Sequence, residues 1–468
     1  MPFMSYDGLI VSPSGYRGIW EKGLNQAMAK KAAKAFARYV GGGEVIVGRD
    51  TRHSGPALVQ AVIAGLYEGG AKIIDVGIAP TPAIIWKARV SGLNGGVVVS
   101  GSHNEPEWNG LKFFLRGGNW PTEKEVDEQY ALYLTERDDG NYDAPTHETE
   151  DIIDEYVDFI ISNLTSAEIE RNRPRVVIDA AGGAGSRVTP RLLRALGAEV
   201  FVINGDEGVF NRKMEPTPDA LSRLSDAVKE KNALVGFAHD CDADRLTLVD
   251  EKGQAQSPNM TLAVIADQEL KKADKNKILV TNVASSALFK DIADRNNGKL
   301  VLSKVGEGHV VRKMLEVNAQ IGGEGSSGGV IQPKLNLTRD GVLAAATITS
   351  YIGRGISLES LISSFPVYYL IRDKINGRAD IGKDMIEAVK SAYPDGQVDT
   401  IDGVRVSWER AWGLVRPSRT EPVTWITAEA RTQVGAQHLF KELVALTKKY
   451  ADFGNNKRFF QRLKRLKE

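Results

Sequence analysis

A short pattern that recurs three times along the chain constrains its fold more than any other feature. In each copy a helix-like segment ends at a glycine and a strand-like run follows directly, over 70–74, 197–201 and 298–302. Glycine is the expected residue just past a helix C-terminus, and helices that alternate with short strands predict α/β units. We therefore expect three similar α/β domains, although chance similarity between strand–helix units would give the same pattern.

Each copy is followed by a second strand-like run that leads into a loop rich in glycine or carboxylate residues. These three loops hold Ser102, Asp240 and Glu324. In open α/β sheets, ligands bind beyond the carboxyl ends of the strands. The economical interpretation is that each domain offers one loop to a shared cleft.

The length of the chain and three breaks in the pattern indicate four domains. A chain of 468 residues exceeds what one hydrophobic core supports. Polar or proline-containing stretches mark candidate boundaries at 136–151, 252–258 and 363–366. The predicted ranges are 1–150, 151–256 and 257–366 for three mixed α/β domains, and 367–468 for the last domain.

The last range is typical of a smaller α+β domain. It holds strand-like runs at 404–406 and 423–428 and a helix-like segment at about 436–450. Its basic end, 457–467, repeats apolar residues at helical spacing. That spacing predicts an amphipathic helix docked on its own protein rather than an arm for nucleic acid or membranes.

Charge and composition exclude several classes of partner. The chain has 60 Lys+Arg and 60 Asp+Glu, so neither nucleic acid nor a membrane is expected, and an anionic substrate must be held by local basic groups. The single cysteine, Cys241, excludes an intrachain disulfide and suits the cytoplasm. No signal peptide is visible, nor an apolar run of the ~18 residues that a membrane helix needs. Monomer and homodimer both stay open.

The segment 97–112 carries the clearest chemistry. The run Val97–Val99 predicts a buried strand that ends abruptly in small and polar residues. The Ser102 hydroxyl then lies at the carboxyl end of this strand, with His103 directly after it and Lys112 further on. A nucleophile near a proton carrier and a cation suits group transfer through a covalent intermediate. Taken alone, a polar strand-to-loop turn explains the Ser-His-Asn run equally well.

A second strand-like run ends in three alternating aspartates, Asp240, Asp242 and Asp244, followed by Arg245. Carboxylates packed so closely repel one another unless a cation neutralises them. All-oxygen ligands select a hard ion such as Mg²⁺ or Ca²⁺. Solvated acidic residues in a turn are the alternative interpretation.

Two further segments carry weaker signals. Segment 320–329 is rich in glycine, which lets the backbone approach a ligand closely, and Glu324 and Ser326 offer groups that bind sugar hydroxyls. Segment 415–422 combines arginines with hydroxyls, a plausible phosphate cradle because arginine binds phosphate bidentately. Its candidate phosphate ligands are Arg416, Ser418, Arg419 and Thr420.

Together these segments resemble the α-D-phosphohexomutase family, which includes phosphoglucomutase, phosphomannomutase and phosphoglucosamine mutase. The similarity to its phosphoserine, metal, sugar and phosphate loops lies at 100–104, 240–245, 323–326 and 416–422. Weaker matches lie at 14–18, 47–52, 80–82 and 339–341. The resemblance runs from about residue 11 to 450 and implies a heart-shaped, four-domain protein with one active-site loop from each domain.

Four positions depart from the family pattern. They are Glu105 in place of proline, Cys241 in place of glycine, Gly328 in place of histidine, and Arg419 in place of glycine or asparagine. None of them removes a reacting group. The loop changes leave the preference among glucosamine, mannose and glucose phosphates open.

The resemblance implies a reversible 1,6-phosphoryl transfer on a hexose phosphate. Ser102 would carry the phosphoryl group, a sugar 1,6-bisphosphate would be the intermediate, and one Mg²⁺ per chain would be held by Ser102 and the three aspartates. Lys112, Arg17 and Arg245 would neutralise the transferring group, with His103 or Lys112 moving the proton. The substrate's own phosphate would lie on Arg416, Ser418, Arg419 and Thr420, and its hydroxyls on Glu324 and Ser326.

Two other functions fit a chain of this kind, a metal-dependent sugar phosphatase and a catalytically silent sugar-phosphate-binding regulator. The intact Ser102, aspartates and Arg245 argue against the silent regulator. Closure of the site by the fourth domain would exclude water, which argues against the phosphatase.

Overall fold

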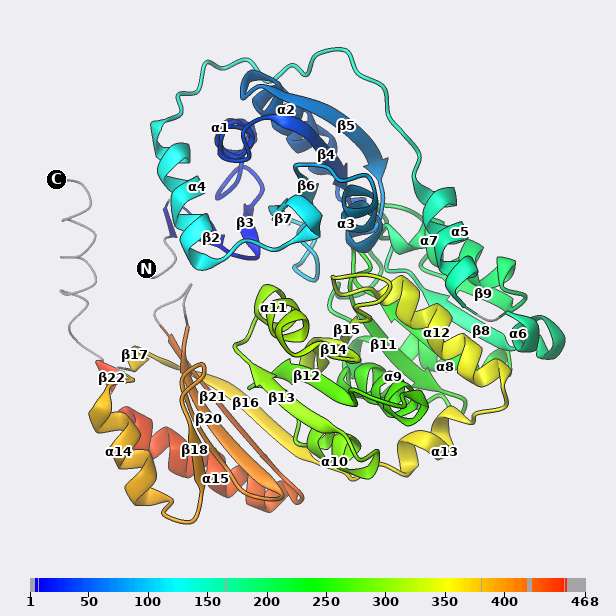
Figure 1. Cartoon of the computed structure of the whole chain (residues 1–468), viewed down its shortest axis with the longest axis vertical. Helices are drawn as coiled ribbons and strands as arrows, with labels where there is room; N and C mark the ends of the chain where they lie inside the picture. The colour runs from blue at the N-terminus through cyan, green and yellow to red at the C-terminus, as the bar shows by residue number, and fades with distance from the viewer. Residues whose placement is uncertain are drawn as a thin grey trace.

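The chain folds into four sheet-based domains that follow one another in a curved row (Figure 1). The computed structural model describes residues 5–6, 8–164, 166–379, 381–418, 423–449 and 451–452. Each of its four main sheets lies within one of the four expected ranges. The expected architecture, three mixed α/β domains and a smaller C-terminal α+β domain, is confirmed, whereas the exact domain boundaries stay a prediction.

The first domain is built on a seven-stranded sheet with helices on both faces. Its strands are β1 (Ser5–Tyr6), β2 (Leu9–Ser12), β3 (Gly15–Ile19), β4 (Gly43–Arg49), β5 (Ala71–Ile78), β6 (Gly95–Val99) and β7 (Trp108–Leu115). Its helices are α1 (Gln26–Tyr39), α2 (Gly55–Glu68), α3 (Thr81–Val90) and α4 (Glu123–Thr135), with a 3₁₀ turn η1 (Arg116–Gly118). The predicted valine strand is β6, which is buried throughout. Val97 and Val99 pack with α1 and α2, while Val98 packs with α3 on the other face.

The second and third domains each have one four-stranded sheet. Strands of the second are β8 (Arg175–Asp179), β9 (Glu199–Ile203), β10 (Val235–His239) and β11 (Leu246–Asp250). Strands of the third are β12 (Ile278–Asn282), β13 (Lys299–Ser303), β14 (Ile321–Glu324) and β15 (Gly329–Ile331). Their helices are α5 (Ile153–Asn163), α6 (Ala167–Asn172), α7 (Gly185–Ala195), α8 (Ser222–Glu230), α9 (Asn259–Lys272), α10 (Leu288–Arg295), α11 (Glu307–Val317), α12 (Gly341–Gly353) and α13 (Leu358–Ser363), with 3₁₀ turns η2 (Pro218–Ala220) and η3 (Gly325–Ser327).

The three α/β domains share one strand arrangement, so the internal repeat is confirmed. The orders β7-β6-β4-β5, β11-β10-β8-β9 and β15-β14-β12-β13 correspond strand for strand. In each, three neighbouring strands are parallel and the fourth pairs antiparallel. Ser102, Asp240 and Glu324 come just after or at the end of the corresponding strands β6, β10 and β14. Each copy therefore presents its loop from the same point of the repeated unit.

The fourth domain is a five-stranded antiparallel sheet in the order β16-β21-β20-β19-β18. Its strands are β16 (Tyr369–Asn376), β18 (Gln397–Asp399), β19 (Val404–Ser407), β20 (Ala411–Pro417) and β21 (Val423–Ala430), and β17 (Arg378–Ala379) pairs with β22 (Ala451–Asp452). Helices α14 (Lys383–Ala392) and α15 (Gln433–Lys448) complete the domain. The strands and the helix expected in this range are present.

Domains one to three share a continuous hydrophobic core. One cluster of buried residues runs from Ile46 and Trp86 through Tyr156 and Phe237 to Phe365. The fourth domain has its own core around Ile426 and α15. It meets the third domain through a small cluster of Val283, Trp412 and Leu414.

The polar stretch 136–151 connects the first two domains and contains no described helix or strand, as expected of a linker. Near its end this stretch lies beside β5. The Asp75 carboxylate accepts a hydrogen bond from His147, and the backbone of Asp75 forms an isolated β-bridge with Thr149. The expected amphipathic helix at 457–467 lies outside the described residues. Among the helices that the structure describes, none combines the length and apolar character needed to cross a bilayer.

Candidate active site

A cavity of about 330 Å³ lies where the four domains meet. The predicted site residues that line it are Arg17, His103, Lys112, Arg245, Glu324, Arg416 and Ser418. Further lining residues that the sequence did not single out include Trp120, Glu307, His309, Arg312 and Trp425. Arg419 and Thr420 lie outside the described residues.

Ser102 follows β6 with its side chain directed across the boundary to the second domain. Its residue is 1% exposed, and its hydroxyl donates to Asp240 Oδ2 at 2.8 Å. The backbone of Ser102 has φ 51°, a left-handed conformation that few residues other than glycine adopt. The predicted nucleophile is thus joined to the first of the three predicted metal ligands.

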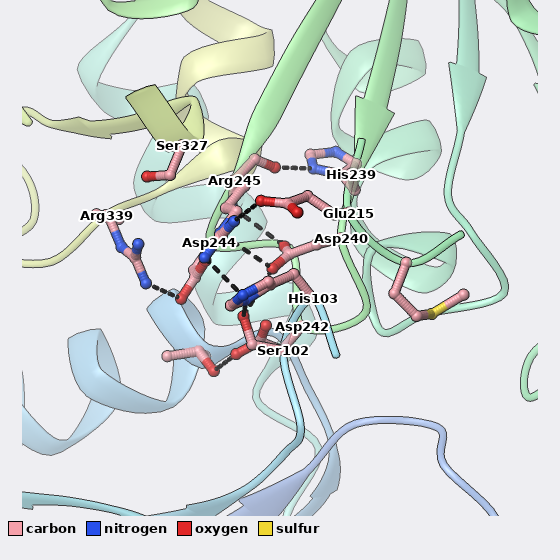
Figure 2. Close-up of polar contacts among 12 residues, drawn as sticks. Ser102, His103, Glu215, His239, Asp240, Asp242, Asp244, Arg245, Ser327 and Arg339 are labelled. Carbon is pink, nitrogen blue, oxygen red and sulfur yellow. Dashed lines mark hydrogen bonds and ion pairs between the residues drawn. The ribbon is translucent and has the colours of Figure 1, made fainter. Parts of the chain in front are cut away.

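His103 lies beside the Ser102 hydroxyl, with 3.4 Å between Nδ1 and Oγ. Arg245 Nη2 donates to His103 Nδ1 at 2.8 Å (Figure 2). Burial, and after it the Arg245 charge, lowers the pKa of His103 well below its ordinary value. A neutral imidazole that accepts at Nδ1 carries its proton on Nε2.

The three aspartates form a compact, fully buried cluster after β10. Each offers a carboxylate oxygen, and these atoms lie within 4.8 Å of one another. Burial, followed by the nearby Asp244 and Asp242 carboxylates, raises the pKa of Asp240 to about 8. The Oδ1 atoms of Asp242 and Asp244 are buried with no hydrogen-bond partner among the described residues. Unpartnered carboxylate oxygens at this spacing fit a hard divalent cation.

Basic side chains surround the carboxylates. Lys112 on β7 donates to Asp242, and to Asp244 Oδ2 at 3.1 Å. Burial acts to lower the pKa of Lys112, but Asp242 and Asp244 outweigh it and the pKa is raised. Arg17 on β3 lies half-buried at the cavity wall, and desolvation of its guanidinium, followed by the Arg245 charge, lowers its pKa to about 10. These cations suit a site that receives phosphate groups.

Arg339 is a charged residue of the site to which the sequence analysis assigned no role. It follows β15 and donates to Asp244 Oδ2 at 2.7 Å, to Glu307 Oε2 at 2.9 Å and to Glu324 Oε2 at 3.4 Å. Figure 2 shows its guanidinium reaching Asp244. The weak family match at 339–341 was the signal for Arg339, and it also contains Asp340, the N-cap of α12.

The two predicted sugar-binding residues, Glu324 and Ser326, lie in different environments. Glu324 is buried at the end of β14, where it also accepts from Asn282 Nδ2 and the Gly306 amide, both at 2.9 Å. Ser326 follows on the 3₁₀ turn η3 and is exposed. Gly328 has φ 72°, and a Cβ there would lie 2.4 Å from the Leu246 carbonyl oxygen. A histidine at position 328 is therefore incompatible with this loop conformation.

Several supporting contacts were also not predicted. Thr81 at the start of α3 donates to Asp242, and Glu215 accepts from Arg245 Nη1 at 3.0 Å. Cys241 packs against Ala181 and Met214, which agrees with a packing role. Arg416, the penultimate residue of β20, and Ser418, just after this strand, line the cavity from the fourth domain.

Comparison with known proteins gives matches over most of the chain. Three family models match, described as phosphoglucomutase/phosphomannomutase, alpha/beta/alpha domains I, II and III, at residues 9–137, 154–253 and 257–368. A phosphoglucomutase/phosphomannomutase of Thermococcus kodakarensis is 37% identical over 92% of this chain and 96% of that protein. A probable phosphoglucosamine mutase of the same organism is 36% identical over 94% and 99%.

A solved structure has the same fold. It is a phosphoglucomutase/phosphomannomutase family protein from Burkholderia thailandensis, which superposes with a TM-score of 0.82 at 28% identity. The match covers 94% of this chain and 99% of that one. At this coverage the structural match extends into the fourth domain, beyond the ranges of the three family models.

Proposed function

Because this chain belongs to the phosphoglucomutase/phosphomannomutase family, the α-D-phosphohexomutases, we propose that Ser102 carries the phosphoryl group in its reaction. The chain is a phosphohexomutase, an isomerase that transfers a phosphoryl group on a hexose phosphate. One observation carries the assignment of Ser102. Its hydroxyl, from the first domain, is bonded at 2.8 Å to Asp240 of the cation-binding cluster in the second.

The proposed transfer moves the phosphoryl group from Ser102 to a hydroxyl of the bound sugar phosphate. The bond between phosphorus and Ser102 Oγ breaks and a bond to the sugar oxygen forms. The sugar hydroxyl loses its proton to His103 or Lys112, the two candidates for proton transfer, and Ser102 Oγ takes up one proton as it leaves, so the serine hydroxyl is restored. Of these two, His103 is placed beside Ser102 Oγ, while Lys112 is bonded to the carboxylates. Arg17, Lys112 and Arg245 stabilise the negative charge of the transferring group.

The three aspartates and phosphorylated Ser102 are the proposed ligands of one Mg²⁺. When bound, this ion supplies Lewis-acid withdrawal of charge from the phosphoryl group. The support is the pair of buried carboxylate oxygens on Asp242 and Asp244 that accept no hydrogen bond from the described residues. Lys112, Arg245 and Arg339 meanwhile hold the carboxylates in one compact arrangement.

The substrate's own phosphate is proposed to bind the fourth domain, through Arg416, Ser418, Arg419 and Thr420. The first transfer makes a sugar 1,6-bisphosphate, which turns end over end so that its other phosphate meets Ser102. Glu324 and Ser326 are the proposed contacts to sugar hydroxyls in both orientations. Of this pair, Glu324 lines the cavity.

The same phosphate cradle must serve both half-reactions, so removing one of its charges should affect both isomers alike. A charged hydrogen bond contributes roughly 1.5–3 kcal/mol. Arg416→Ala should therefore weaken the 1-phosphate and the 6-phosphate sugar by about one to two decades each, measured as Kd by calorimetry. Arg410→Ala, an exposed arginine that pairs with Glu409 near the same sheet, is the control. Loss of affinity for only one isomer contradicts a shared cradle.

The reaction and the sugar are tested together by ³¹P NMR with glucose, mannose and glucosamine 1-phosphates. We expect conversion to the 6-phosphate without release of inorganic phosphate for at least one of the three. Release of inorganic phosphate as the main product would instead identify a phosphatase. Binding of all three sugars without turnover would identify a silent regulator.

The proposal also covers the binding partners, the oligomeric state and the cellular location of the protein. The hexose phosphate is the proposed partner, with no nucleic acid and no membrane, and the protein acts as a monomer or homodimer. A cytoplasmic location is supported by the single cysteine, Cys241, which is a free and buried thiol.

A further inference from the structure

Arg52 is a fully buried arginine directly behind the Ser102 loop. Its residue is 0% exposed, and it is not among the described residues that line the cavity. A guanidinium has five N–H donors in a rigid fork. The guanidinium of Arg52 makes five hydrogen bonds, and four of their acceptors are main-chain carbonyls of the loop that carries Ser102. The acceptors are Asp50 Oδ2 at 3.1 Å, Ser102 O at 2.8 Å, Asn104 O at 2.6 Å, Glu105 O at 2.6 Å and Trp108 O at 2.9 Å.

Asp50 extends this contact to the backbone of Ser102. Its carboxylate accepts from the Arg52 amide at 2.9 Å and from Ser100 Oγ at 2.6 Å. Ser100 Oγ in turn accepts from the Ser102 amide at 2.8 Å. Both the N–H and the C=O of Ser102 are therefore held, one through Ser100 and one by Arg52 itself.

The conformation held in this way is an unfavourable one for the residues concerned. Ser102 has φ 51°, and such a residue persists only where its surroundings enforce it. Gly101 allows the close approach, because a Cβ at that position would lie 2.7 Å from the guanidinium carbon of Arg52. The loop that carries Ser102 is therefore packed around the guanidinium of Arg52.

We propose that Arg52 is a positioning residue for phosphoryl transfer, which sets the loop conformation that aims Ser102 Oγ at Asp240. This inference rests on the proposed role of Ser102. Arg52 does not line the cavity and makes no described hydrogen bond to Asp240, Asp242 or Asp244, so its hydrogen bonds reach the site through the loop backbone and Asp50. Lysine cannot replace it, because a compact ammonium with three donors does not match acceptors spread around a planar fork.

The test is chemical rescue of Arg52→Ala by free guanidinium. A displacement of a reacting group by about 1 Å can cost about 100-fold in rate, so kcat should fall by roughly that factor. KM for the sugar phosphate should change little, because the cavity lining is intact. Millimolar guanidinium chloride should restore part of the lost kcat, while the same concentration of sodium chloride should not.

Arg52→Lys and Val62→Ala make the test independent of stability. Arg52→Lys should also lose kcat and hold less phosphoserine by intact mass. Val62 is buried in α2 and belongs to the hydrophobic cluster on the same sheet, so Val62→Ala should destabilise the domain while leaving every hydrogen bond of Arg52 in place. If Arg52→Ala does not fold, Arg52→Lys decides.

Three results would overturn the inference. They are wild-type kcat and phosphoserine content in Arg52→Lys, the same loss of kcat in Val62→Ala, and a folded Arg52→Ala that guanidinium does not rescue. Failure of the underlying function is distinguishable, because Ser102→Ala would then keep its activity whatever happens at Arg52.

Discussion

Ser102→Ala is expected to lower turnover by roughly 10³-fold or more, because the variant has no oxygen to carry the phosphoryl group. The fold should persist. The hydroxyl makes one cross-domain hydrogen bond, to Asp240, and alanine has the same backbone preference as serine at φ 51° to a good approximation. Assays of 1-phosphate conversion, together with thermal unfolding, measure both effects.

Intact-mass and peptide mapping complete the experiment. Protein as purified should carry phosphate on Ser102 alone, and the variant should carry none. Ser91→Ala, an exposed serine at the end of α3, is the control and should keep both phosphate and activity. Phosphate found on another residue, or full activity in Ser102→Ala, would refute the assignment.

Chelation of divalent cations is expected to abolish activity, and added Mg²⁺ should restore it. Mn²⁺ should substitute for Mg²⁺ and also allows binding to be measured directly. Asp242→Asn should weaken Mn²⁺ binding, followed by electron paramagnetic resonance, together with turnover. Removing a group that only orients a metal ligand already costs 10–100-fold, so loss of a ligand should cost at least about 100-fold. The unpartnered Oδ1 of Asp242 is the physical reason.

The control for the metal experiment is Asp219→Asn. Asp219 lies in the same domain on an exposed turn, where it pairs with Lys213. It should leave both Mn²⁺ binding and turnover unchanged. A chelated enzyme that keeps its full rate would rule out the metal role of the cluster.

The repeated architecture could be predicted because its signals are local. A glycine past a helix end and a valine run such as Val97–Val99 need no knowledge of distant residues. The same holds for the alternation of Asp240, Asp242 and Asp244, which places three carboxylates in one turn. Each loop was therefore visible as a candidate, but taken alone each also had a plain turn as an alternative, and only the order and spacing of the family motifs favoured the site.

The contacts between loops could not be predicted in this way. Ser102 and Asp240 are 138 positions apart, and only the packing of two sheets brings them together. Arg52 and Arg339 lie in the weaker family matches at 47–52 and 339–341, but their roles could not be predicted, because most of their partners are main-chain carbonyls and carboxylates from distant segments. Closeness in sequence was no better guide for Glu324 and Ser326. Glu324 is buried at the end of β14, whereas Ser326, two residues later, is exposed on the 3₁₀ turn η3.

The continuous core of the first three domains determines how the catalytic groups reach their places. Closely packed interiors resist small displacements, and the loops that hold Ser102, the aspartates and Glu324 all rise from sheets that this one core joins. Their dipoles and charges are thus pre-organised, and little reorganisation energy is needed when a phosphate arrives. The fourth domain contacts the third through a small separate cluster, so if the proposed reorientation of the substrate takes place, adaptation to its two orientations falls to this domain and to the sugar itself.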